Sequence, residues 1–354
     1  MALLPCGIHF ESYRKDMAYL HTRLQWVFFI AFLALLFGLP FLVSVRFISI
    51  MNIMTMICIA VVGLQITIGY AGQTNLGQSA FMGMGAFVTG SLAINFQLPF
   101  WVTIPAGGLS AALFGSIFGV PALRIKGFYL AITTIAAQIM FPLFIIHMPD
   151  RVFGGSLGLK MEPARLWGIV FNTDRSLYYL IMTTGVIMIF FSFNLVRSRV
   201  GRAFIAVRDN DLAAEIMGIN VFYYKALGFF IGALYAGVAG GLWAYYIRYI
   251  GADQFTLYYS VWFVGMVIVG GLGSILGAIL GTIFIRSIQE IISYLGPFLV
   301  KFLPHVAGEE VWFAGMNILL GGVIILFLIL DPRGLYHRWV LLKTSYRIWP
   351  FPYV

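Results

Sequence analysis

Long apolar stretches alternate with short polar segments along most of the chain. Apolar runs of about 17–25 residues can cross a bilayer as helices, and about ten can be placed here. Segment 288–303 either completes the ninth span or lies in the membrane interface. The predicted spans are 25–44, 48–70, 78–96, 99–123, 128–148, 177–195, 226–246, an eighth and ninth that share 258–285 with a break at 270–274, and 311–330.

Composition supports a membrane protein. Hydrophobic residues make up 61% of the chain and charged residues 10%, and the mean hydropathy is +0.94. A soluble domain usually has about a quarter of its residues charged. We therefore expect an all-α fold: a polytopic transmembrane helix bundle that forms one domain over residues 1–354.

Positive charge predicts how the bundle is oriented. The net charge is +9, and Lys and Arg gather at both ends and between 197 and 208. Cytoplasmic loops of membrane proteins carry such an excess, so nucleic-acid binding is not expected. We expect segment 1–24, loop 197–225 and tail 331–354 in the cytoplasm. The polar stretch 150–175 would lie outside, although its three arginines and one lysine argue against that side.

No catalytic or metal-binding pattern is apparent. Cys6 and Cys58 lie far apart in sequence, the five histidines are scattered, and Gly-Lys, which a Walker A motif needs, never occurs. No nucleophile–base constellation can be assembled either. The sequence therefore predicts no catalytic residue, no metal and no cofactor.

Small residues at a spacing of four favour close helix packing in lipid. The strongest example is the ridge Gly273, Gly277 and Gly281, which we expect to contact another helix. Chance spacing among 39 glycines is the alternative. Weaker ridges are Gly232, Ala236, Gly240 and Gly115, Gly119.

Polar residues at membrane depth are the candidates for a translocation path. Segment 69–79 holds five polar side chains (Gln73, Thr74, Asn75, Gln78 and Ser79) beside three glycines, between two apolar runs. It is either a connecting turn at the cytoplasmic surface or a buried break that lines an aqueous path. Gln65, Gln138 and Asn317 lie inside spans and are expected chiefly to bond neighbouring helices. The path candidates are Gln73, Asn75, Gln78, Gln138 and Asn317.

Buried acid–base pairs, which proton-driven carriers use, are not apparent within the predicted spans. Asp253 and Glu290 are placed at span edges. This argues against an ion-coupled carrier.

The 197–225 loop predicts a short amphipathic helix at about 208–218. Asp209 or Asn210 can cap its start, and Gly218 can end it. Such a helix either docks a soluble partner or rests on lipid headgroups. The candidate coupling residues are Arg208, Asp211, Ala213, Ala214, Glu215 and Gly218.

This loop resembles the coupling segment of ABC importer permeases, in which Ala-Ala-x-x-x-Gly recurs as residues 213–218. Leu212 stands where Glu is usual, and the later Ile-x-Leu-Pro is absent. With these two departures, the loop resembles the corresponding loop of the branched-chain amino-acid permease family, in particular of its LivM-type subunit. The resemblance covers about residues 45–335, and its other motifs are 69–73 with 76–77, 81–86, 154–159, 269–274 and 332–335.

The resemblance implies a permease subunit of a bacterial inner-membrane importer with no ATP site of its own. It implies a homologous second permease, two cytoplasmic ATP-binding subunits and a periplasmic binding protein as partners, besides membrane lipid. The helix at 208–218 would sit in a groove of one ATPase. The mostly apolar lining would suit branched aliphatic amino acids, and the binding protein would set most of the specificity.

Alternatives remain open. An importer of the same fold could carry urea, amides or aromatic amino acids. From another class, a stand-alone ion-coupled carrier or channel would transport without ATP, and a membrane enzyme is a more distant third.

Overall fold

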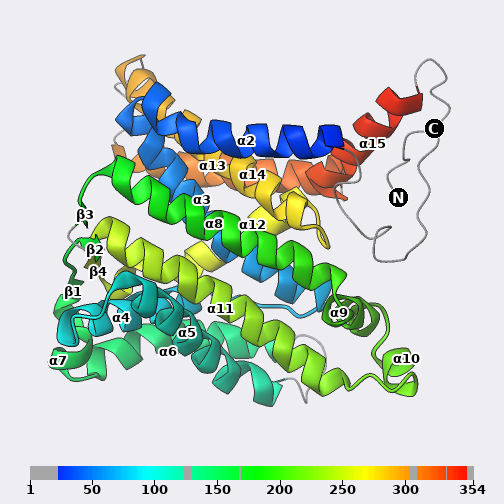
Figure 1. The fold of residues 1–354 in the computed structure, drawn as a ribbon, viewed down its shortest axis with the longest axis horizontal. Coiled ribbons are helices and arrows are strands. Elements are labelled where there is room, and N and C mark those ends of the chain that lie inside the picture. The colour runs from blue at the N-terminus through cyan, green and yellow to red at the C-terminus, as the bar shows by residue number, and fades with distance from the viewer. Residues whose placement is uncertain (1–22, 123–128, 167–168, 303–308, 332, 349–354) are drawn as a thin grey trace.

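The computed structural model describes residues 23–122, 129–166, 169–302, 309–331 and 333–348. Within these ranges the chain is a bundle of long helices with two very short two-stranded ribbons (Figure 1). The long helices are α2 (Arg23–Leu42), α3 (Val45–Gln65), α4 (Gln78–Asn95), α5 (Phe100–Ala122), α6 (Tyr129–His147), α8 (Asp174–Arg197), α11 (Val221–Ile247), α12 (Leu257–Gly270), α13 (Ile275–Phe302), α14 (Glu309–Leu330) and α15 (Gly334–Ile348).

The predicted helical bundle is confirmed. Eight helices among the described residues are long and apolar enough to cross a membrane, while the total of ten spans stays a prediction. The predicted break at 270–274 is present, because α12 ends at Gly270 and α13 begins at Ile275. The uncertain segment from 288 onward continues α13 without interruption to Phe302.

The two ends of the bundle differ in character. One end, here called the α10 end, carries α9 (Arg199–Asp209), α10 (Asp211–Ile216), the start of α2 and α15 (Figure 1). These are the places where Lys and Arg gather, so the elements expected on one side of the membrane do lie at one end. Which side of the membrane this end faces stays a prediction from the charge pattern.

The opposite end, here called the ribbon end, holds most of the polar stretch 150–175. It contains α7 (Asp150–Phe153), the 3-10 helix η2 (Gly155–Leu157) and the antiparallel pair β2 (Ala164–Leu166) and β3 (Ile169–Phe171). A second pair joins β1 (Leu159–Lys160) to β4 (Tyr249–Ile250). The all-α prediction did not include these ribbons. The β1–β4 pair ties the loop after α6 to the loop after α11, whereas β2 and β3 both lie in the loop after α6.

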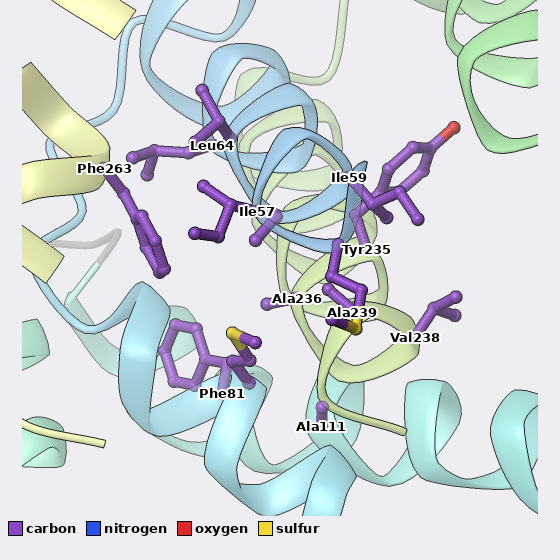
Figure 2. Packing of buried hydrophobic residues seen from close by; sticks show 14 of the residues in the cluster. Ile57, Ile59, Leu64, Phe81, Ala111, Tyr235, Ala236, Val238, Ala239 and Phe263 are labelled. Atoms are coloured by element: carbon purple, nitrogen blue, oxygen red, sulfur yellow. The ribbon is translucent and has the colours of Figure 1, made fainter. Parts of the chain in front are cut away.

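Helix α11 forms the centre of the bundle and packs against α3, α4 and α5. Small residues allow this: a Cβ on Gly232 would collide with Thr67 in the π-helical turn that follows α3, and one on Gly240 with the Met82 carbonyl of α4. In Figure 2, Phe81 and Phe263 lie on one side of this core, and Tyr235 and Val238 on the other. Close backbone contact replaces large side chains, as expected for helices that gain little from hydrophobicity in lipid.

Candidate functional site

The 197–225 loop contains two helices, where one was predicted. Ser198 caps α9 by accepting from the amides of Val200 and Gly201. Asn210 caps α10 by accepting from the amide of Ala213. The predicted helix at 208–218 is therefore shorter, Asp211–Ile216, and Arg208 belongs to the end of α9.

Helix α10 presents apolar side chains to the outside of the protein. Ala214 is fully buried, whereas Leu212, Ile216 and Met217 are 62%, 86% and 71% exposed. Glu215, another predicted coupling residue, is also exposed. Exposed apolar residues grouped on a short helix at the end of a bundle suit either a protein partner or a lipid surface.

Gly218 ends α10 in the left-handed conformation, with φ of +80°. Its amide donates to the Glu215 carbonyl, and the amide of Ile219 donates to the Ala214 carbonyl. These two bonds form a Schellman motif, in which glycine avoids the strain of a Cβ. The predicted stop at Gly218 is confirmed.

Three polar contacts attach this loop to the bundle. Arg208 donates from Nη1 to the Gly69 carbonyl at 2.8 Å. Gln73 donates to the Lys225 carbonyl at 2.8 Å, and Lys225 forms an ion pair with Asp211. Helices α9 and α10 are therefore linked to segment 69–79 by hydrogen bonds and an ion pair.

Segment 71–77 is a break that turns back into the bundle, with Gly72 and Thr74 exposed and Gln73, Asn75 and Gly77 buried. Helix α3 ends in a π-helical turn, η1 (Ile66–Tyr70), and α4 begins at Gln78. The Gln78 side chain donates to the carbonyls of Ala60 and Gly232 at 2.8 and 3.2 Å. Ala60 precedes the end of η1 by ten residues, so α4 starts about 15 Å inside the α10 end.

Helix α12 also starts inside the bundle, and it runs the opposite way. It follows β4 and the 3-10 helix η3 (Ala252–Gln254), and its 14 residues span about 21 Å, less than the apolar core of a bilayer. Its Ser260 hydroxyl accepts from the Ser79 amide in the first turn of α4 at 2.9 Å. The starts of α4 and α12 therefore meet inside the membrane.

A single glutamine joins these two starts. Gln138 of α6 accepts at Oε1 from the Ala80 amide (2.9 Å) and from the Ser260 hydroxyl (3.0 Å). Its Nε2 donates to the Phe255 carbonyl at 2.6 Å. One side chain thus satisfies groups from both broken helices, and it is only 3% exposed.

Two more side chains complete this cluster, which we call the helix-start junction: Asn75, Gln78, Thr134, Gln138 and Ser260. Asn75 donates to the Gln78 side chain and accepts from the Gly77 amide. Thr134 accepts from the Leu76 amide. All five are buried, and within the part of the chain that the structure describes none has an unpaired buried polar atom.

The predicted path residues therefore occupy tight hydrogen-bonded positions. Gln73, Asn75, Gln78 and Gln138 are 0–3% exposed, and only Gln73 keeps a buried oxygen, Oε1, without a partner among the described residues. The interhelical bonds expected of Gln65 and Gln138 are present, with Gln65 donating to the carbonyls of Gly271 and Ser274.

Their role in transport stays a prediction. Asn317 lies in α14, but its side chain falls outside what the structure describes.

The glycine ridge is split between a helix and a turn. Gly277 and Gly281 lie in α13, where an added Cβ would press on backbone atoms of Gly270 and Met266 in α12. Gly273 lies instead in the turn before α13, with φ of +81°, and faces the Arg208 guanidinium. The expected contact with another helix is therefore present at Gly277 and Gly281, while Gly273 lies in the predicted break at 270–274.

One charged pair within a span was missed from the sequence. Helix α13 continues to Phe302, so Glu290 lies within the helix, four residues before the end of the candidate span Ile275–Tyr294. It pairs with Arg286 one turn earlier, Nη2 to Oε1 at 3.3 Å. The i, i+4 spacing of Arg286 and Glu290 was the signal available in the sequence.

Comparison with known proteins agrees with this architecture. The model of a protein family described as "Branched-chain amino acid transport system / permease component" matches residues 46–328. The chain is 28% identical over 338 residues to the high-affinity branched-chain amino acid transport system permease protein LivM of Escherichia coli, covering 89% of this chain and 75% of that protein.

More distant relatives include a probable branched-chain amino acid transport permease protein LivM of Methanocaldococcus jannaschii, 24% identical, covering 77% of this chain and 88% of that protein. Another is the nucleoside ABC transporter permease protein NupC of Lactococcus lactis, 25% identical, covering 49% of this chain and 59% of that protein. No solved structure matches the chain.

Proposed function

The chain belongs to the family of branched-chain amino acid transport system permease components, and from that premise we propose that it moves branched-chain amino acids across a bacterial inner membrane in an ATP-driven importer. The relatives with the widest coverage are branched-chain amino acid permeases, whereas the nucleoside permease matches about half of this chain. Leucine, isoleucine and valine are therefore the proposed substrates.

The observation that carries the mechanism is the physical connection from α10 to the helix-start junction. Helix α10 exposes apolar residues at one end of the bundle, and Arg208 and Gln73 tie its surroundings to segment 69–79. That segment leads within a few residues to the start of α4, which meets α12 at Gln138. A partner that pulls on α10 would thus displace two helices that begin inside the membrane.

The partners follow from this mechanism. The chain itself shows no Walker A sequence, so we assign ATP hydrolysis to two cytoplasmic ATP-binding subunits, one of which takes α10 into a groove. A homologous second permease would complete the path, and a periplasmic binding protein would deliver the substrate. The charged pair on α13 keeps the ion-coupled carrier in consideration as the second candidate.

Purification and reconstitution separate these two candidates. In mild detergent we expect two ATP-binding subunits and a second permease to purify with this chain. Proteoliposomes that hold the complex should take up leucine only with ATP and the binding protein. Uptake by this chain alone, driven by an ion gradient and without ATP, would refute the importer.

Docking of α10 predicts a sharp effect of two exposed residues. Ile216→Glu with Met217→Glu should leave folding unchanged, because both side chains already face outward. Stimulated ATP hydrolysis should fall about tenfold or more, as expected when charges enter an apolar interface. The matched control is Leu157→Glu, an 84% exposed apolar residue at the ribbon end, which should hydrolyse ATP normally. Normal hydrolysis in the double variant would argue for a lipid-surface role.

A further inference from the structure

A partly exposed polar patch on α13 lies within the candidate span Ile275–Tyr294 and is not part of the helix-start junction. It comprises Arg286, Gln289 and Glu290, with Tyr259 of α12 close enough to interact electrostatically with the arginine. We call it the α13 polar patch.

Two contacts along α13 define how deep the patch lies. At one end of the helix, Gln65 of α3 donates to the Ser274 carbonyl. At the other, the Arg46 guanidinium lies 5.5 Å from the centre of the Tyr294 ring. Arg286 is twelve residues beyond Ser274 and eight before Tyr294, about 18 Å and 12 Å along the helix. Arg286 therefore lies well within the candidate span Ile275–Tyr294, and Glu290 lies one turn nearer to its Tyr294 end.

The patch is neither fully buried nor fully satisfied. The Arg286 and Glu290 side chains are 17% and 31% exposed, and Tyr259 is 43% exposed. The Nη2 to Oε1 distance of 3.3 Å is longer than is usual between a guanidinium and a carboxylate. Arg286 Nε is buried and has no hydrogen-bond partner among the described residues.

These features argue against contact with lipid. Charged side chains within membrane spans face the bundle interior or a water-filled cavity, and they mark pathways for charged or polar ligands. A purely structural pair would be closed and fully bonded, whereas this one retains a free donor and a stretched contact. A polar ligand that enters here could be bound without first breaking a strong ion pair.

We infer that the α13 polar patch contacts the charged groups of a zwitterionic α-amino acid as it crosses the membrane. Arg286 would bind the carboxylate, for which its planar guanidinium is suited, and Glu290 would bind the ammonium. Exposed apolar residues beside the patch, Val261, Ile283 and Ile291, would contact an aliphatic side chain. The inference rests on the proposed function and names the residues that would recognise its substrate.

A charge swap separates this role from a structural one. The double variant Arg286→Glu with Glu290→Arg keeps an ion pair at the same spacing but reverses its polarity. The single variant Arg286→Gln removes only the guanidinium that is proposed to bind the carboxylate of the amino acid. The control is Arg165→Gln, which removes an arginine from the exposed ion pair with Glu162.

The measurement is leucine transported per ATP hydrolysed, by the complete complex in proteoliposomes with its binding protein. Both patch variants should assemble and hydrolyse ATP when the loaded binding protein is added. Each should transport about tenfold less leucine per ATP, the loss of one hydrogen bond to a charged group. The control should match the unaltered complex.

The outcomes are distinguishable. If the unaltered complex moves no leucine, the proposed function fails. If it does and the swapped variant matches it, the inference alone fails. Loss of assembly in the variants would assign the patch to contact with the second permease and would also overturn the inference.

An accessibility experiment tests the same inference without a charge change. In a Cys6→Ser background, the variant Tyr259→Cys should react with a water-soluble thiol reagent in the assembled complex, and excess leucine should slow the reaction. The variant Ile139→Cys, on the exposed apolar face of α6, should not react. If the thiol introduced by Tyr259→Cys stays unreactive, the patch lies against lipid or protein and the inference of a path is refuted.

Discussion

The helix-start junction and the α13 polar patch are two groups of polar residues at membrane depth, and they differ in how well they are satisfied. Gln78, Gln138 and Ser260 are 0–3% exposed and fully bonded to neighbouring helices. Arg286 and Glu290 are partly exposed, stretched apart and short of one partner. Polar residues within spans are thus of two kinds, those that hold helices together and those that remain available to a ligand.

The two groups of residues also differ in how many helices they connect. The helix-start junction joins two helices that begin inside the bundle, and in the proposed mechanism a movement of α10 is transmitted to it. The α13 polar patch lies on one uninterrupted helix. If the comparison is right, changes in the helix-start junction should reduce stability, whereas changes in the α13 polar patch should reduce transport.

The largest effect is expected for Gln138→Leu. It leaves the Ala80 amide, the Ser260 hydroxyl and the Phe255 carbonyl without their partner. Each unsatisfied buried group costs about 1–3 kcal/mol, so stability should fall by about 3 kcal/mol or more. Unfolding of the purified protein in detergent, followed by heat or denaturant, measures this. Thr133→Val on the same helix is the control, since its hydroxyl bonds only the Tyr129 carbonyl of its own helix. Equal stability of the two variants would contradict a structural role for the helix-start junction.

A smaller loss is expected for Ser260→Ala, about 1–2 kcal/mol, because the Ser79 amide loses its acceptor. Combined with Gln138→Leu, the loss should be less than additive, since both residues belong to one network. The control is Ser116→Ala, whose hydroxyl bonds the Ala112 carbonyl of its own helix. Full additivity in a double-mutant cycle would show that the two helix starts are held independently.

The smallest change in stability is expected for Glu290→Gln, about 0.5 kcal/mol or less, as for other i, i+4 ion pairs that water can reach. Glu162→Gln, in the exposed pair with Arg165, provides the matched comparison. Leucine transport should nevertheless fall in the Glu290 variant and not in the Glu162 variant. A loss of stability as large as that of Ser260→Ala would place Glu290 among the structural residues.

The sequence predicted local features well. Asn210 and Gly218 bracket α10, as their capping preferences indicate. The break after Gly270 followed from a cluster of glycines. Such features depend on a few neighbouring residues, so they can be inferred without knowing the fold.

Features that depend on distant partners could not be predicted in the same way. Gly273 was grouped with Gly277 and Gly281 by spacing, but its approach to Arg208 depends on how two distant segments pack. The segment after residue 288 was left open in the sequence because the length of α13, which continues to Phe302, could not be judged. Gln78 and Gln138 could be placed on their helices, but not against the groups that they bond.

The sequence by itself determined that the chain is a membrane-spanning helical bundle with a charged, capped helix between two spans, since run length, hydropathy and caps are local properties. Only the tertiary structure decided that α4 and α12 begin inside the bundle and meet at Gln138, and that Arg208 reaches the Gly69 carbonyl, 139 residues away in the chain. The physical reason is that a polar group at membrane depth must find a partner, and helix packing determines which one.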